Sequence, residues 1–362
     1  MVSFRSHRAR SRFAGGLIAL TALAVMPIPN SLGQSVQWTE TFQDDPIVAD
    51  RFSVPPGHDD LRFTYDGGSQ RLTAHFDTFE PTAWYVRPLD LNTPVAFGDC
   101  DEFEFTVTFR VLSAGFFADP DQFAQIGWGL INSATTGTDR AGGAGPDFAF
   151  DNVAFDYFPN VSPLFGGPTL GSTLIHSDTG AGYFSEFEFP FGAESRIDTP
   201  FGDEDIALDV LTTATVHFNP QTQVLTLTVS QGGNDLAINA DGTGGPGGTD
   251  ADATTIQTAL FVDHPFSVDS FAITLWQDTF NPFGSSVIAD VEFSEIQFAG
   301  QLRPPGDMNG DGAANGLDVA PFVEVLLGSV PSSCQTASGD FDESQSVTID
   351  DVDGFVAALV GS

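Results

Sequence analysis

Hydrophobic and polar residues alternate over short stretches between residues 34 and 300, which predicts β-strands. Residues 103–111 are apolar at every second position. Residues 214–218 and 223–229 alternate in the same way on either side of Asn219-Pro220-Gln221-Thr222, which predicts a hairpin over residues 215–229. A second hairpin is predicted from residues 61–65 and 71–76.

Further strands are predicted late in this region, over residues 271–276 and 287–298. No stretch here keeps helical apolar spacing for three turns. Many short strands separated by turn residues favour two packed sheets, so the predicted fold class is mainly β.

The hairpin 215–229, the opening stretch 42–52 with the hairpin 61–76, and the closing strands 271–298 together resemble the concanavalin A-like (laminin-G-like) lectin and glucanase sandwich. The resemblance implies a jelly-roll β-sandwich with a concave sheet that often binds saccharide. A plain structural sandwich is the main alternative.

The pattern changes after Arg303-Pro304-Pro305-Gly306. Two adjacent prolines form a stiff extended joint. Residues 301–305 are therefore expected to be a linker between the sandwich, residues 34–300, and a small C-terminal domain, residues 306–362. That domain consists of two Asp-rich loops, each followed by an apolar helical pattern, over residues 319–327 and 352–360.

The first loop places oxygen-bearing residues at alternate positions of a twelve-residue calcium loop, because every second side chain of a chain wrapped around an ion points inward. Gly312 permits the sharp turn, and Asp318 stands where Glu is usual. A solvated, Asp- and Asn-rich turn is the alternative. The predicted ligands are Asp307, Asn309, Asp311, the carbonyl of Ala313, Asn315 and Asp318.

The second loop repeats this spacing, with Gln345 in place of the glycine. Ser344 is a neutral, weak ligand, and fewer charged ligands weaken calcium binding. This second site is therefore expected to be weak or empty. Its predicted ligands are Asp340, Asp342, Ser344, Thr348 and Asp351.

The duplicated loop and helix after a proline joint resembles a dockerin domain. The resemblance implies an α-helical, calcium-binding module that docks onto a cohesin-like domain of a scaffold or cell surface. The family recognises its partner at loop positions that are here Gly316 and Leu317, then Ile349 and Asp350. These differ from the Ser/Thr pair of the best-known members, so another partner is also possible.

Residues 1–33 predict a secretory signal peptide, with an Arg-rich start, an apolar run and small residues before Gln34. The apolar run is shorter than the ~20 residues that a membrane-spanning helix needs. The mature protein is expected to be secreted, extracellular or cell-surface associated. Cys100 and Cys334 fall in different predicted domains and are interpreted as isolated thiols, although a single bridge remains possible.

The chain holds 49 Asp+Glu against 12 basic residues, giving a net charge of −37. Such a field repels phosphate backbones and anionic lipids, which excludes nucleic-acid and membrane-surface binding. It suits calcium and uncharged ligands. Because 41% of the residues are hydrophobic and 35 are Phe, the chain is expected to fold.

Paired carboxylates are the candidate catalytic groups, since glycoside hydrolysis needs two of them about 5–10 Å apart. Glu186 and Glu188 are weak candidates, and so are Glu102 and Glu104. Both pairs alternate with Phe, which is typical of a half-buried strand with its acids outward. The three-acid strand motif of concanavalin-like glucanases lacks its third acid here, so no catalytic residue is assigned.

Other acids and aromatics are candidates for binding. Structural calcium or solvated loops are the two interpretations of Asp147, Asp151, Asp156, Asp241, Asp250 and Asp252. Stacking platforms for sugars or core packing are the two interpretations of Trp84, Tyr85, Trp128 and Trp276.

Three functions are consistent with these patterns. The first is a secreted saccharide-binding or adhesion protein that is tethered through its dockerin-like module. The second is a polysaccharide-degrading enzyme, a glycoside hydrolase or lyase, attached through the same module. The third is a structural surface protein without a glycan ligand.

Overall fold

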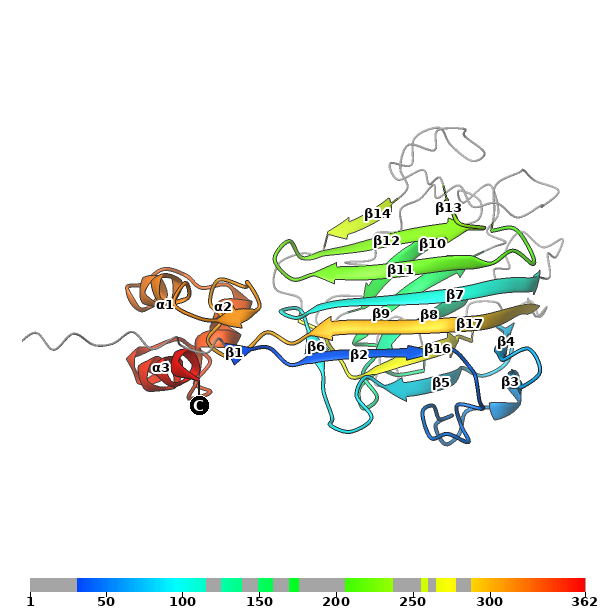
Figure 1. Ribbon diagram of the computed structural model, residues 1–362, viewed down its shortest axis with the longest axis horizontal. Coiled ribbons are helices and arrows are strands. Elements are labelled where there is room, and N and C mark those ends of the chain that lie inside the picture. The colour runs from blue at the N-terminus through cyan, green and yellow to red at the C-terminus, as the bar shows by residue number, and fades with distance from the viewer. Residues whose placement is uncertain are drawn as a thin grey trace, which may run out of the picture.

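The computed structural model of the chain shows a β-sandwich with a small helical module at one end (Figure 1). Of the described residues, no helix is long and apolar enough to cross a membrane. The first 30 residues of the predicted signal peptide and the candidates Glu186, Glu188, Asp147, Asp241, Asp250 and Asp252 lie outside the described residues. The structure describes residues 31–114, 125–138, 149–158, 169–175, 206–236, 255–259, 265–277 and 288–361.

The larger sheet has nine strands. They are β2 Ser35–Glu40, β3 Phe63–Asp66, β4 Arg71–Asp77, β7 Glu102–Ala114, β11 Thr212–Asn219, β12 Val224–Gln231, β13 Asn234–Asp235, β14 Thr255–Ala259 and β17 Ile288–Gln301. The order is β13-β12-β11-β7-β17-β4-β3, with β14 also paired to β12 and β2 to β17. On one side β17 runs along β7, and on the other it pairs with β4 and then β2.

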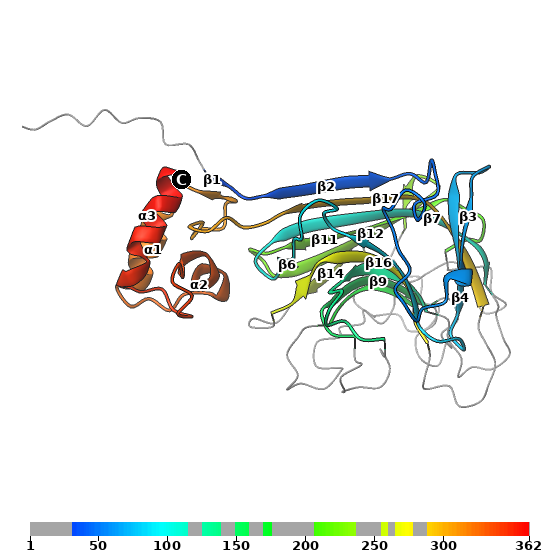
Figure 2. The ribbon, with the colours of Figure 1, turned by 90° about the horizontal axis from the view of Figure 1, so that it is seen from below.

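The smaller sheet has five antiparallel strands in the order β10-β9-β8-β16-β5. They are β5 Ala83–Pro88, β8 Ile126–Ile131, β9 Asn152–Phe158, β10 Thr169–Ile175 and β16 Ser270–Leu275. Figure 2 shows the two sheets as separate layers. Two short pairs complete the strands: β6 Phe97–Gly98 with β15 Ser267–Val268, and β1 Ser31–Leu32 with β18 Ala313–Ala314.

The apolar core lies between the two sheets, because alternate residues of each strand point inward. On β7 the side chains of Phe103, Phe105 and Phe109 are buried, whereas Glu102 and Glu104 are exposed. Each buried Phe contributes roughly 1.5–3 kcal/mol to folding. The outward placement of this pair of acids was predicted and is confirmed.

The hairpin predicted around residues 219–222 is β11 and β12, in which Asn219 pairs with Val224. The second hairpin, β3 with β4, starts later than predicted because residues 60–62 form a 3-10 turn, η1 Asp60–Arg62, capped by Asp59. The two late strands predicted are β16 and β17, and they lie in different sheets. The predicted mainly β sandwich is therefore confirmed.

The C-terminal module contains α1 Val319–Leu326, α2 Ser333–Gly339, a 3-10 turn η3 Ile349–Asp351 and α3 Val352–Val360. Both predicted helices are present, and α2 is an additional one. Phe322 and Phe355 stack at 3.9 Å between ring centroids and, with Met308, form a small core of their own. The module lies beyond one end of the strands (Figures 1 and 2).

The proline joint, residues 301–305, makes hydrogen bonds to the sandwich and to the module. The backbone N–H of Leu302 donates to the carbonyl of Gln34, and that of Arg303 donates to Asp101 Oδ1 at 2.7 Å. The pair β1–β18 joins the segment before β2 to the first loop of the module. The proline joint is thus fixed at several points.

Candidate functional site

The first predicted calcium loop wraps around two fully buried carboxylates, Asp307 and Asp318. Asp307 accepts hydrogen bonds from the backbone N–H groups of residues 310, 311 and 312, at 2.7, 3.2 and 2.9 Å. Asp318 accepts from those of residues 308, 309 and 315, at 2.7, 2.9 and 2.7 Å. Gly312, with φ 83°, provides the left-handed turn that this wrapping needs.

The remaining predicted ligands of this loop bond to one another. Asn309 donates from Nδ2 to Asp311 Oδ2 at 3.0 Å, and Asn315 donates from Nδ2 to the carbonyl of Ala313 at 3.0 Å. Every predicted donor atom to the metal is an oxygen, as calcium prefers. The first-loop residues therefore fit a calcium ion chemically.

The second loop brings its acids close together. One carboxylate oxygen from each of Asp340, Asp342 and Asp351 lies within 4.8 Å of the others. Asp351 is fully buried and accepts from three backbone N–H groups, as Asp318 does. Ser344 donates its hydroxyl to the carbonyl of Ser346, and Thr348 donates to Asp351 Oδ2. The grouping of the acids suits a divalent cation. That calcium binds this second site weakly or not at all stays a prediction.

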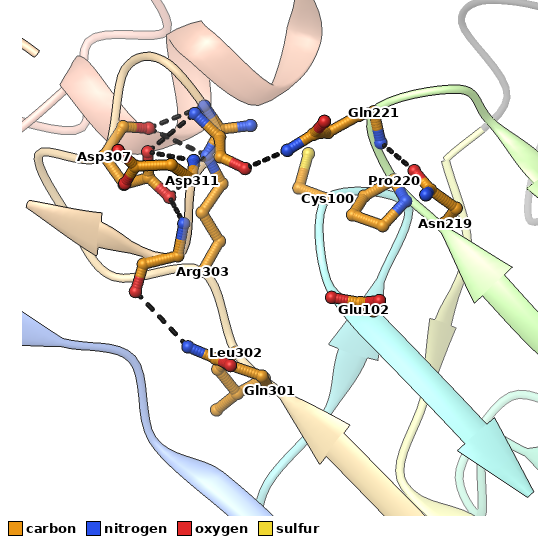
Figure 3. Close-up of a pocket in the computed structure, with 12 residues that line it drawn as sticks. Cys100, Glu102, Asn219, Pro220, Gln221, Gln301, Leu302, Arg303, Asp307 and Asp311 are labelled. Carbon is orange, nitrogen blue, oxygen red and sulfur yellow. Dashed lines mark hydrogen bonds and ion pairs between the residues drawn. The ribbon is translucent and has the colours of Figure 1, made fainter.

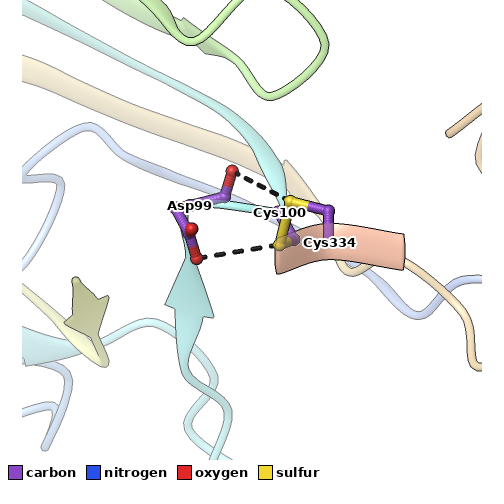
Figure 4. Close-up of side chains that lie close together, drawn as sticks. All are labelled: Asp99, Cys100 and Cys334. Atoms are coloured by element: carbon purple, nitrogen blue, oxygen red, sulfur yellow. Dashed lines mark hydrogen bonds between the residues drawn. A yellow bond between two sulfur atoms is a disulfide. The ribbon is translucent and has the colours of Figure 1, made fainter. Parts of the chain in front are cut away.

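Cys100 and Cys334 form a disulfide between the sandwich and the module (Figure 4). The interpretation of the two as isolated thiols is wrong. The turn between β6 and β7 lies against α2, so their Cα atoms are 5.2 Å apart despite 234 residues of separation. Asp99 lies beside them, but since both sulfur atoms are in the bridge, neither is a thiolate ligand for a metal.

A polar cleft of about 260 Å³ separates the first loop from the end of the larger sheet (Figure 3). Gln221, from the β11–β12 turn, donates to the carbonyl of Gly310, and Gln301 donates to that of Gly312 at 3.3 Å. Arg303 donates from Nε and Nη2 to the carbonyl of Asp307 at 2.8 and 2.6 Å. Burial lowers the pKa of Arg303, and nearby acids, Asp307 foremost, oppose this.

One row of residues crosses all five strands of the smaller sheet on the face away from the core. The register pairs Trp84 with Thr274, Thr274 with Gly127, Gly127 with Asp156, and Asp156 with Gly171. Because cross-strand neighbours share a face of the sheet, the side chains of Trp84, Thr274 and Asp156 lie on the same face, with Gly127 between the last two. The row was not predicted, although glycines at 127 and 129 around Trp128 signal close approach within a strand.

Gly127 lets two polar side chains of this row approach its backbone closely. A Cβ atom there would lie 3.1 Å from Asp156 Oδ1 and 3.2 Å from Thr274 Oγ1. Gln125 donates to Asp156 Oδ1 at 2.9 Å, and Thr173 to Oδ2 at 2.6 Å. Thr274 Oγ1 is buried and has no hydrogen-bond partner among the described residues. In the part of the chain that the structure describes, the row therefore contains an unsatisfied buried hydroxyl beside a buried carboxylate.

The four predicted aromatic platforms are buried. Tyr85 and Trp128 face the core, where Trp128 packs on Phe109 and Phe155. Trp84 and Trp276 do lie on the opposite face of the smaller sheet, as expected for Trp276, but they are only 6% and 2% exposed. That face is also apolar and carries a second cluster of packed residues. The position of Trp276 opposite the core-facing residues of its strand therefore did not make it exposed.

Asp151 and Asp156 do not lie in solvated loops, contrary to one of the two interpretations. Both are buried. Asp151 accepts from the backbone N–H of Ser267 and from the hydroxyl of Thr135, at 3.1 and 2.8 Å. Protein donors therefore hold these two carboxylates in place.

Comparison with known proteins gives a fold likeness alone. No protein-family model matches the chain, and no curated protein matches it. Among similar solved structures, peanut lectin is 11% identical over 74% of this chain and 98% of its own, with TM-score 0.38. Basic winged bean lectin, solved with Tn-antigen, is 10% identical over 74% of this chain and 99% of its own, with TM-score 0.42. Lotus tetragonolobus seed lectin is 15% identical over 75% of this chain and 100% of its own, with TM-score 0.39. At these values the likeness says nothing about what this chain binds.

The class that the fold defines is a mainly β protein of two packed antiparallel sheets. In this chain a small C-terminal helical module follows the sandwich, and a disulfide joins the two.

Proposed function

We propose that this chain is a secreted, saccharide-binding β-sandwich that carries a calcium-binding, partner-docking C-terminal module. The observation that carries the proposal is the duplicated carboxylate cradle of the module. Asp318 and Asp351 stand at the same position of the two loops, both are fully buried, and each accepts three backbone hydrogen bonds. Arg303 lies 3.8 Å from Asp307 and balances part of the charge at the first loop. A buried carboxylate is costly unless a cation balances it, and calcium is the cation that such oxygen-only loops select.

The disulfide supports the proposed secretion. Disulfides persist in oxidising compartments and are rare in the cytosol. The bridge between Cys100 and Cys334 therefore fits the predicted signal peptide. N-terminal sequencing of protein recovered from the medium tests cleavage, and recovery of the intact chain from the cytosol alone contradicts it.

The proposed docking surface is the exposed apolar face of the module. Leu317 and Ile349, at two of the family's recognition positions, are 68% and 74% exposed, and Leu327, directly after α1, is 82% exposed. Several exposed large apolar residues on a module this small favour a protein partner, which we take to be cohesin-like.

Surface plasmon resonance against immobilised cohesin domains tests this docking. Leu317→Asp with Ile349→Asp is expected to weaken calcium-dependent capture at least tenfold, because charge replaces apolar contact at the interface. Val48→Asp, at an equally exposed apolar residue of the sandwich, is the matched control. Capture that is unaffected by the module variant contradicts the assignment.

The row across the smaller sheet supports the saccharide-binding function. Thr274 and Asp156 place a hydroxyl and a carboxylate on either side of Gly127, and Trp84 lies next in the row. Sugar hydroxyls both donate and accept, so they match this pair, and an indole matches the apolar face of a sugar ring.

A polysaccharide panel with the full chain tests this function. Retention without new reducing ends supports binding, and release of product favours the enzyme. The absence of both retention and product favours a structural protein. Gly127→Ala places a methyl 3.1 Å from Asp156 Oδ1 and 3.2 Å from Thr274 Oγ1, which must shift both side chains, and is expected to abolish retention. Gly67→Ala is the matched control, because its new methyl meets only ordinary contacts with Tyr65 at 3.5 Å. Retention by Gly127→Ala at the wild-type level overturns the placement of the site.

A further inference from the structure

The cleft beside the first loop continues into a second hollow. The first has a volume of about 260 Å³ and the second about 330 Å³, and Glu102 and Gln301 line both. Together they run from the first calcium loop, across the outer face of β7 and β17, to His217 of β11. Their shape suits a short extended molecule.

The polar groups along this path are only partly used. Gln221 and Gln301 bond through their amide nitrogens to carbonyls of the first loop, and the described residues provide no donor to their amide oxygens. Glu102 holds His217 Nε2 with Oε1 at 3.0 Å, which leaves Oε2 for a ligand. Arg303 uses Nε and Nη2 on the loop, which leaves Nη1 as a donor.

These groups define the class of ligand. Three acceptors and one donor match a molecule that is rich in hydroxyl groups. Glu102 and Asp311 repel an anion. The aromatic side chains of the lining are Phe103, which is buried in the core, and the imidazole of His217, which Glu102 engages, so recognition rests on hydrogen bonds to hydroxyl groups. Each hollow is near the lower end of the roughly 300–1,000 Å³ range of ligand pockets, which suits single sugar units in sequence.

We infer that this path is a second saccharide-binding site, for a short glycan segment, and that calcium in the first loop shapes it. The inference rests on the proposed saccharide-binding function but concerns a surface remote from the row on the smaller sheet. One wall of the path is the loop itself, through Asp311 and the carbonyl of Gly310 that Gln221 holds. A metal that orders the loop also orders this wall, and by linkage the glycan raises the affinity for calcium by the same factor.

The test is calorimetric titration of the full chain with cellohexaose, laminarihexaose, xylohexaose and maltohexaose, in calcium and then in EDTA. One of these probes is expected to bind at the path with at least tenfold lower affinity in EDTA. Gln221→Ala with Gln301→Ala is expected to weaken the same binding at least tenfold, because each substitution removes an amide oxygen that accepts a hydrogen bond from the ligand. Gln297→Ala, an exposed glutamine elsewhere on β17, is the matched control.

Gly127→Ala separates the two sites. Binding that Gly127→Ala abolishes, and that neither EDTA nor the glutamine variants change, overturns this inference and leaves the proposed saccharide function standing. Binding that is insensitive to all of these variants overturns both placements. If no hexasaccharide binds at all, the second site is rejected together with the saccharide function.

Discussion

Asp318 shows how a single residue of the first loop is prepared for a cation. Burial raises the pKa of its carboxyl, and the nearby charge of Asp307 adds to this, while the backbone N–H groups of residues 315, 309 and 308 act in the opposite direction. The backbone N–H groups hold the carboxyl group in place, and Arg303 pairs with the neighbouring Asp307 at 3.8 Å. A divalent ion bound here would add positive charge beside both acids.

Asp318→Asn is expected to lower calcium affinity at the first loop at least tenfold, because it removes a charged oxygen ligand while keeping the shape of the side chain. Calorimetric calcium titration measures the change. Asp353→Asn, on the exposed side of α3, removes the same charge without touching a loop and serves as the control. Equal affinities in the two variants would show that Asp318 is not a ligand.

At the scale of elements, the two loops differ in their turns. Gln345 occupies the position of Gly312 and takes the same left-handed conformation, with φ 67°. A side chain in this conformation costs roughly 1 kcal/mol, which glycine avoids. The second loop therefore keeps the geometry of the first at a cost in stability.

Gln345→Gly is expected to stabilise the module by about 0.5–1 kcal/mol in the absence of calcium, after allowing for the extra freedom of glycine in the unfolded chain. The midpoint of urea unfolding measures this change in stability, provided that the dependence of the free energy of unfolding on urea concentration is the same in both proteins. The reverse change, Gly312→Ala, is expected to destabilise the first loop. A midpoint that falls for Gln345→Gly contradicts the strain argument.

Strand alternation predicted the larger sheet well and the smaller one poorly. On β7 and β11 one face meets the core and the other meets water, so period-two patterns reveal both the strand and its inward face. The smaller sheet buries both faces, and its strands β8 and β16 are buried at every residue. For that reason the sequence could not show that Trp84 and Trp276 are packed, nor bring Thr274, Gly127 and Asp156 into one row.

The C-terminal loops were predictable because their ligands are local in sequence, from Asp307 to Asp318 and from Asp340 to Asp351. The helix α2 was missed because it has no apolar period. Its start is marked only by the reciprocal cap between Ser332 and Gln335.

At the scale of the whole molecule, the module does not hang from a free linker. A disulfide, the β1–β18 pair and the bonds of Gln221, Gln301 and Arg303 fix it to the sandwich. These contacts join segments far apart in the sequence, 234 residues for the disulfide and more for the β1–β18 pair, and no local pattern encodes such a pairing. A partner bound to the module would therefore hold the sandwich in a fixed orientation.

Replacing Cys100 and Cys334 together by serine is expected to destabilise the folded chain by about 3–5 kcal/mol, because the bridge closes a very long loop in the unfolded state. Guanidinium unfolding with and without reductant measures this. Thiol labelling of the native protein gives the control, since no reactive thiol is expected. Labelling of both cysteines under native, non-reducing conditions contradicts the bridge.

The central claim is that the C-terminal module binds calcium, and calorimetric titration of chelator-treated full chain with calcium tests it most directly. The account predicts saturable binding of one ion at the first loop, weak or no binding at the second, and a rise in the melting temperature of the module. Asp318→Asn with Asp351→Asn should abolish both effects. No heat of binding, together with a far-UV spectrum and melting curve that EDTA leaves unchanged, would contradict the account.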